Sequence, residues 1–103
     1  MEDTVLHLLQ LRYTATEDDV TPHIAGHVAY LERHHAAGTF LVSGQTVPTS
    51  EGGAIIAHGV DRDTIEQITG QDPFVTNGVA KYTITTTPGR IHPVLADVLA
   101  QGL

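Results

Sequence analysis

Residues 70–84, GQDPFVTNGVAKYTI, place an aspartate, a proline and a phenylalanine between a segment with helical spacing and an alternating, strand-like segment. Asp72 directly precedes Pro73, and aspartate before proline is a common helix start, in which the carboxylate accepts a hydrogen bond from the first turn. A carboxylate is also the usual group that orients a histidine base for proton transfer. The two roles are compatible, because a cap fixes the direction of the carboxylate.

Histidines are unusually frequent, with seven in the chain, and His23, His27 and His34 fall along one predicted helix. Imidazoles exchange protons near neutral pH and also bind metals. We expect His27 to lie deepest of the three, at the edge of the apolar stripe. Alone, such a histidine is more commonly a border residue than a catalyst. A metal-binding stripe is the other interpretation, but no HExxH motif or matching carboxylate accompanies it, so no metal site is predicted.

Other candidate site residues lie in predicted strands. Ser43 precedes Gly44, but the chain has no G-x-S-x-G nucleophile elbow, so we expect Ser43 to hydrogen-bond a substrate or to stabilise a hairpin. Tyr82 is a candidate pocket residue, although sheet packing is the more ordinary role for a tyrosine there. Residues 52–53 are two glycines without a following helix and lysine, so they are typical of a turn and not of a phosphate loop.

Size and charge restrict the classes of function. A chain of 103 residues is expected to form a single domain over 1–103. A net charge of -7 without a basic cluster argues against nucleic-acid binding, and no apolar run is long enough to span a membrane. The absence of cysteine excludes disulfides and thiolate chemistry. Together with an acidic N-terminal stretch, it favours a cytoplasmic protein.

Hydrophobic periodicity predicts the elements that position these residues. A buried strand is expected first, followed by a helix that begins at Thr16 or Asp18 and ends before Gly38, with Val20, Ile24, Val28 and Leu31 on its core face. The predicted strands cover 4–14, 39–48, 54–60 and 78–88, and the predicted helices cover the segment up to Ala37, 61–71 and a C-terminal tail, 92–103.

This β-α-β-β-α-β order predicts a ferredoxin-like α+β sandwich with an added C-terminal helix. Two helices on one face of a four-stranded sheet leave the other face uncovered. A homodimer packed sheet to sheet would bury that face, and we expect one.

Three segments resemble the YciI-like family, also called the YCII-related domain: HVAYLERHHAAGTFLVSGQ (27–45), GGAIIA (52–57) and DPFVTNGVAKYTI (72–84). The resemblance extends over about residues 5–87. It implies a ferredoxin-like fold that dimerises through its sheets, as a dimeric α/β barrel, and an active-site pair that matches His27 and Asp72. Some members of the family are associated with dehydrochlorination of chlorinated hydroxyquinols. The chain departs from the family at Gln45, where proline is usual, and in its extra histidines.

Together, these observations predict a small cofactor-free lyase or isomerase, in which His27 moves a proton and Asp72 orients it. The substrate would be a small metabolite, with a hydroxylated ring as one candidate, contacted by His23, Ser43, Gly44 and Tyr82. The alternative is a non-catalytic dimeric module that binds small molecules or serves as an accessory protein, and a metal-dependent oxygenase is a third possibility. A cavity of a few hundred Å³ beside the imidazole would favour the enzyme, whereas a sealed pair would favour a structural role.

Overall fold

Four antiparallel strands form one sheet in the order β2-β3-β1-β4 in the computed structural model, which describes residues 4–100. The strands are β1 (Thr4–Tyr13), β2 (Phe40–Gln45), β3 (Gly52–His58) and β4 (Ala80–Gly89). The helices are α1 (Glu17–Val20), a 3-10 turn η1 (Thr21–His23), α2 (Ile24–Ala36), α3 (Arg62–Gly70), α4 (Pro73–Thr76) and α5 (Pro93–Ala100). The predicted α+β class is confirmed, and the arrangement is consistent with a ferredoxin-like fold.

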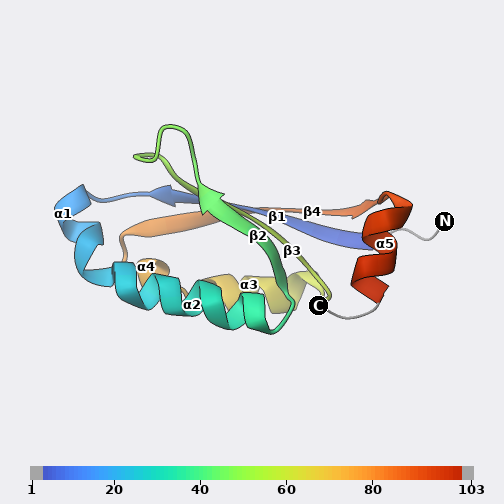
Figure 1. Cartoon of the computed structure of the whole chain (residues 1–103). Helices are drawn as coiled ribbons and strands as arrows, with labels where there is room; N and C mark the ends of the chain where they lie inside the picture. The colour runs from blue at the N-terminus through green and yellow to red at the C-terminus, as the bar shows by residue number, and fades with distance from the viewer. Residues whose placement is uncertain (1–3, 101–103) are drawn as a thin grey trace.

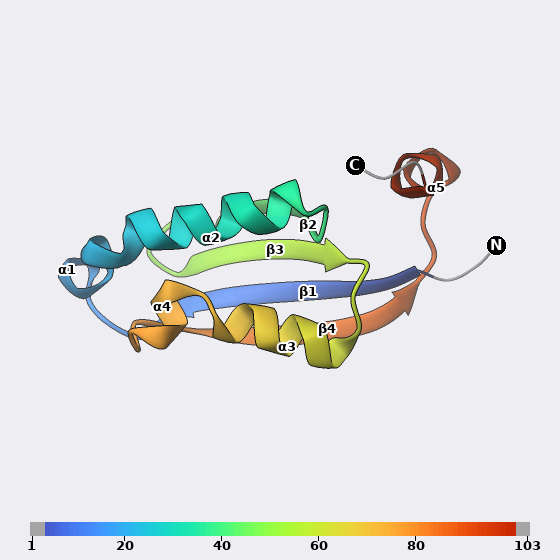
Figure 2. The same ribbon diagram turned by 90° about the horizontal axis from the view of Figure 1, so that it is seen from below.

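All the helices between β1 and β4 lie on one side of the sheet (Figure 1). Helix α2 runs along the half of the sheet that contains β2 and β3, while α3 and α4 run along the half that contains β4 (Figure 2). Within residues 4–100, no helix covers the opposite face of the sheet. Helices α2 and α4 contact each other over the covered face of the sheet.

Strand β1 shows how the sequence specifies the two faces of the sheet. Its residues His7, Leu9 and Leu11 are buried beneath the helices, whereas the alternate residue Leu8 remains 45% exposed on the uncovered face. This period of two is the pattern expected of a sheet with one covered face. His7 is a fully buried imidazole, and it is held between the Thr86 hydroxyl and the Val60 carbonyl at 2.8 Å each.

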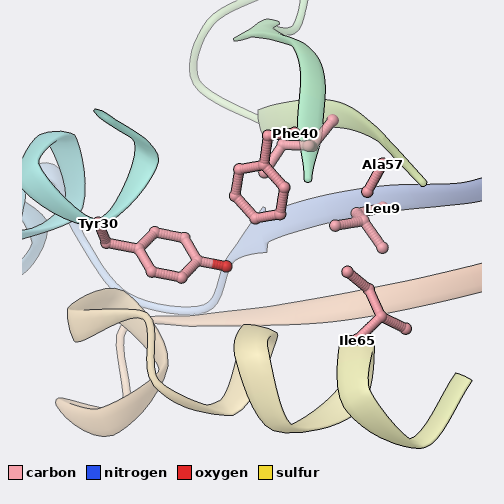
Figure 3. Packing of buried hydrophobic residues seen from close by; sticks show 6 residues of the cluster. Leu9, Tyr30, Phe40, Ala57 and Ile65 are labelled. Carbon is pink, nitrogen blue, oxygen red and sulfur yellow. The ribbon is translucent and has the colours of Figure 1, made fainter. Parts of the chain in front are cut away.

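Two groups of buried side chains form the core between the sheet and the helices. The larger group includes Leu9 from β1, Tyr30 from α2, Phe40 from β2 and Ile65 from α3, with Tyr30 extending from its helix into the space above the sheet (Figure 3). The second group contains Phe74 of α4 and lies toward the other end of β1. Tyr82 packs against both groups, and it therefore connects the two halves of the core.

The first predicted helix is divided into three pieces. Thr16 caps α1 through a capping box with Asp19, as its sequence indicated. Pro22 lacks a backbone N–H, and the chain forms a 3-10 turn around it before α2 begins at Ile24. The helix ends before Gly38, whose φ of 80° is the left-handed conformation that glycine adopts readily.

The predicted core face of α2 is partly wrong. Val20 is buried, but Ile24 and Val28 are 46% and 43% exposed, and the deepest side chain of α2 is Tyr30. The helix is rotated so that His27, Tyr30 and His34, at intervals of three and four residues, face inward. Two imidazoles and a phenol can occupy this position because their rings pack against other aromatic rings of the core.

The predicted C-terminal tail contains a helix, α5, whose apolar residues Val94, Leu95 and Val98 are exposed. The last part of the predicted tail, 101–103, and the first residues of the predicted domain, 1–3, lie outside the described residues. Between residues 4 and 100, none of the helices is long and apolar enough to cross a lipid bilayer.

Candidate active site

Asp72 is a fully buried carboxylate at the N-terminus of α4. Its Oδ1 accepts a hydrogen bond from the backbone N–H of Phe74 at 2.9 Å, so Asp72 is the helix cap that the sequence indicated. Both carboxylate oxygens also lie 2.9 Å from Nδ1 of His27. The predicted hydrogen bond between His27 and Asp72 is therefore present, and the cap and the contact with the imidazole coexist.

Two groups, Asp72 and Phe74, hold the His27 ring in place. Asp72 accepts the hydrogen bond from Nδ1, which places the proton of the neutral ring on Nδ1 and leaves Nε2 as its basic nitrogen. The Phe74 ring stacks on the imidazole, with a centroid distance of 4.1 Å and an interplanar angle of 11°. Only 14% of the His27 side chain is exposed. A hydrogen bond and a stacked ring thus fix the orientation of the imidazole.

Tyr82 provides a third hydrogen bond to the carboxylate. Its hydroxyl donates to Oδ2 of Asp72 at 2.6 Å, and the Tyr30 hydroxyl lies 3.5 Å from that of Tyr82. Burial, followed by the nearby Tyr30 and Asp72, raises the pKa of Tyr82 far above its ordinary value. Burial likewise raises the pKa of Tyr30. Tyr82 consequently remains a protonated phenol and a permanent donor to Asp72.

A cavity of about 310 Å³ opens beside His27, between α2 and the sheet. The wall on the helix side includes Ile24, His27, Val28 and Leu31, and Phe74 closes the end near α4. Strands β1, β2 and β3 form the floor. The volume lies at the lower end of the range for small-molecule sites. The His27–Asp72 pair is therefore not sealed by side chains on every side.

Ser43 and Gly44 both line this cavity on the edge strand β2. The Ser43 hydroxyl lies 2.7 Å from Nε2 of His35, which comes from the last turn of α2. This bond holds the hydroxyl at the β2 side of the cavity, while Phe74 and His27 occupy the side near α4. The cavity thus has a polar group on each side and an apolar middle.

The other two predicted contact residues lie elsewhere. Tyr82 does not line the cavity: it sits behind Asp72, on the side of the carboxylate remote from the open space. His23 belongs to the 3-10 turn before α2 and is also absent from the cavity wall. The structure therefore brings Ser43, Gly44 and His27 to one cavity and leaves Tyr82 and His23 outside it.

Three residues that contact the predicted site residues were not predicted from the sequence: Tyr30, His35 and Phe74. The sequence did contain an indication for Phe74. A residue two positions after a capping aspartate donates its backbone N–H to the carboxylate and must therefore lie close to it. Tyr30 is three residues after His27 and shares its helix face, which is a second signal. The contact of His35 with Ser43 depends on how α2 crosses β2, and the local sequence gives no indication of it.

His34 lies on the same face of α2, between the rings of Tyr30 and Phe40, at centroid distances of 5.1 Å from each. Burial lowers the pKa of His34, and the neighbouring Arg33 lowers it further. Its Nε2 is buried and has no hydrogen-bond partner among the described residues. Across residues 4–100, no three His, Cys, Asp or Glu side chains are grouped closely enough to hold a metal ion.

Comparison with known proteins gives a family and a structural neighbour. The model of the YCII-related domain matches residues 5–88. No curated protein matches the sequence. A similar solved structure is that of 5-chloro-2-hydroxyhydroquinone dehydrochlorinase from Burkholderia phenoliruptrix, in complex with 2,5-dihydroxybenzoquinone. It has a TM-score of 0.63 and 22% sequence identity, and the match covers 78% of this chain and 90% of that one. At this identity the likeness concerns the fold.

Proposed function

Because this chain belongs to the YCII-related domain family, we propose that it is a small enzyme that uses His27 and Asp72 for proton transfer, without a metal or cofactor. The reaction would be of the lyase or isomerase type, on a small molecule bound in the cavity beside His27. One observation carries the proposal: the imidazole is bonded through Nδ1 to a fully buried carboxylate, and the same ring forms part of the cavity wall.

The geometry supports a defined role for each group. Nε2 of His27 would accept a proton from a substrate in the cavity, which converts the imidazole to an imidazolium. Asp72 would stabilise that cation through the hydrogen bond at Nδ1, as carboxylates do for other histidine bases. In an isomerase the proton would return to another atom of the substrate. In a lyase the electron pair left behind would form a double bond and expel a leaving group from the neighbouring carbon.

The cavity wall favours a small, largely apolar substrate that carries hydroxyl or carbonyl oxygens. Leu11, Ile24, Val28, Leu31 and Ile55 supply apolar surface, while the Ser43 hydroxyl offers one hydrogen bond. A hydroxylated ring fits this description. The structural neighbour, a dehydrochlorinase in complex with a dihydroxybenzoquinone, supports the same class of substrate.

We also propose that the protein is a homodimer in which a second copy covers the open face of the sheet. Val42, Ile56 and Leu8 lie side by side on β2, β3 and β1 and are 57%, 37% and 45% exposed. Such a row across three strands is costly to leave in water.

The enzymatic proposal can be tested with 5-chloro-2-hydroxyhydroquinone as the first substrate, with chloride release as the readout. We expect turnover that persists in EDTA and falls about 100-fold or more in His27→Ala. Asp72→Asn should lower the rate while keeping the fold, because asparagine also caps helices. His92→Ala is the matched control, since His92 is exposed before α5, and its rate should equal that of the wild type.

Two results would contradict this function. Full activity in Asp72→Asn, with unfolding of Asp72→Ala, would reduce Asp72 to a helix cap. A folded protein that binds 2,5-dihydroxybenzoquinone but turns over none of a panel of halogenated hydroxyquinols would indicate a binding module instead of an enzyme.

A further inference from the structure

A second cavity, of about 280 Å³, adjoins the one beside His27. The two share three lining residues, Tyr13, Ile24 and Gln45, which belong to β1, α2 and β2. Ligand sites commonly measure about 300–1,000 Å³, so the first cavity lies at the lower end of this range and the second lies just below it. The three common residues show that the two cavities are adjacent, on the side of the first cavity where Tyr13, Ile24 and Gln45 lie.

The second cavity has more polar residues in its lining than the first. Apart from the shared residues, its lining includes Glu17, at the start of α1, and Thr49 and Ser50, in the loop between β2 and β3. Within residues 4–100, none of these three side chains hydrogen-bonds to another residue, and neither does the Gln45 amide. Four polar side chains are therefore available to a ligand in the second cavity, and one of them, Gln45, lies where the two cavities adjoin.

Among the described residues, neither cavity is lined by Lys or Arg, and the second cavity is lined by one acidic residue. All five Lys and Arg residues of the chain lie within residues 4–100, and none of them lines either cavity. The only formal charge among the residues that line the second cavity is that of Glu17. A carboxylate or phosphate on the ligand would be repelled by Glu17, whereas an ammonium would be attracted to it. The hydroxyls of Thr49 and Ser50 and the Gln45 amide can each donate or accept a hydrogen bond, so an alcohol can also be satisfied there.

We propose that this second cavity is a subsite for a side arm of the substrate, and that the arm ends in a cationic or uncharged hydrogen-bond donor. The proposal rests on the proposed function for the position of the ring, which lies beside His27 while the arm passes Tyr13 and Gln45 toward Glu17. The substrate class is accordingly a hydroxylated ring with a short amine or alcohol arm. Rings with an anionic arm are disfavoured by the negative charge of Glu17.

Three phenols with matched skeletons test the arm: tyramine, 4-(2-hydroxyethyl)phenol and 3-(4-hydroxyphenyl)propionate. They are titrated into isotope-labelled protein, and the amide resonances of His27, Gln45, Thr49 and Ser50 are followed by NMR. We expect tyramine to bind at least about fivefold more tightly than the propionate, with the alcohol between them. Amide shifts at Thr49 and Ser50 should accompany those at His27.

Two variants identify the source of the preference. Glu17→Gln should bring tyramine and the alcohol to similar affinity, while Asp63→Asn, which removes an exposed carboxylate on α3, should leave the ratio unchanged. His27→Ala should keep the preference, since the arm does not depend on proton transfer.

Equal or tighter binding of the propionate would overturn the subsite, and so would binding that shifts His27 but not Thr49 and Ser50. Failure of all three phenols to shift either cavity would also refute it. These outcomes are independent of the proposed catalysis, because they measure binding. Absence of turnover by the wild-type protein, with the preference for tyramine still present, would refute the enzyme and leave the subsite in place.

Discussion

The Asp72 carboxylate illustrates how much of this site depends on single hydrogen bonds. It accepts from the Phe74 amide, from His27 and from Tyr82, while none of its surface reaches solvent. A buried charge is tolerated only when it is paired and hydrogen-bonded, because desolvation is otherwise costly. Each of the three donors therefore supports both the fold and the orientation of His27.

We predict that Tyr82→Phe removes one of these donors without creating a cavity. The free energy of unfolding should fall by about 1–3 kcal/mol, the cost of leaving a buried acceptor less satisfied, and turnover should also fall. Urea denaturation measures the first effect. Tyr13→Phe is the stability control, because Tyr13 packs edge-on against Phe74 and its hydroxyl bonds no residue in the described chain. Equal stability of the two variants would show that Tyr82 contributes only packing.

At the scale of single residues, the sequence predicted the pair of His27 and Asp72 but not the residues that surround it. His27 and Asp72 emerged from a family resemblance together with the capping pattern, and the structure shows their hydrogen bond. The position of Tyr82 behind Asp72 depends on β4 passing beneath α4, a contact between distant elements. Side-chain alternation places Tyr82 on the helix-facing side of β4, but it does not specify which group Tyr82 meets there.

Among the elements, α2 is the one whose orientation decides the site. An apolar stripe of Val20, Ile24, Val28 and Leu31 predicted a rotation that turns His27 to the edge of the interface. In the structure Tyr30 is the central buried side chain, and Ile24 and Val28 line the cavity instead of the core. Apolar side chains that face a binding cavity have the same periodicity as those that face a core, so hydrophobicity alone could not separate the two.

The approach of α2 to α4 depends on Gly26, next to His27. A β-carbon at Gly26 would lie 3.2 Å from Cγ of Pro73, which is tighter than ordinary contact, and Pro73 follows Asp72 directly. We predict that Gly26→Ala moves α2 away from α4 by a few tenths of an ångström and lowers turnover by weakening the bond between His27 and Asp72. Its stability should change little, because alanine favours a helix by up to about 1 kcal/mol over glycine and this offsets the strain.

Gly70→Ala is the matched control for that prediction. Gly70 ends α3, and a β-carbon there would meet nothing within 4 Å. This variant should be as stable as the wild type or more so, with unchanged turnover. If Gly26→Ala also kept full turnover, the spacing between α2 and α4 would not control the site.

At the scale of the whole molecule, the order of elements was predictable because each strand and helix has its own periodicity and end signals. The order of strands in the sheet followed from the rules for crossovers and hairpins. The 3-10 turn at Pro22 was less accessible, since it is short and is defined by local hydrogen bonds, whereas Asp72 and Pro73 indicated the start of α4. The proposed dimer would cover the open face of the sheet, and its geometry depends on two chains and not on one.

The apolar row Val42, Ile56 and Leu8 makes the assembly testable. Light scattering should give about twice the chain mass of 11.0 kDa at micromolar protein. Ile56→Lys places a charge at the centre of the row and should yield a folded monomer, because a buried unpaired ammonium costs more than the contact provides. Val47→Lys is the control: Val47 is 96% exposed in the loop after β2, so the dimer should persist. A mass near 11.0 kDa for the wild type up to millimolar concentration would refute the dimer, and the exposed row would then need another partner.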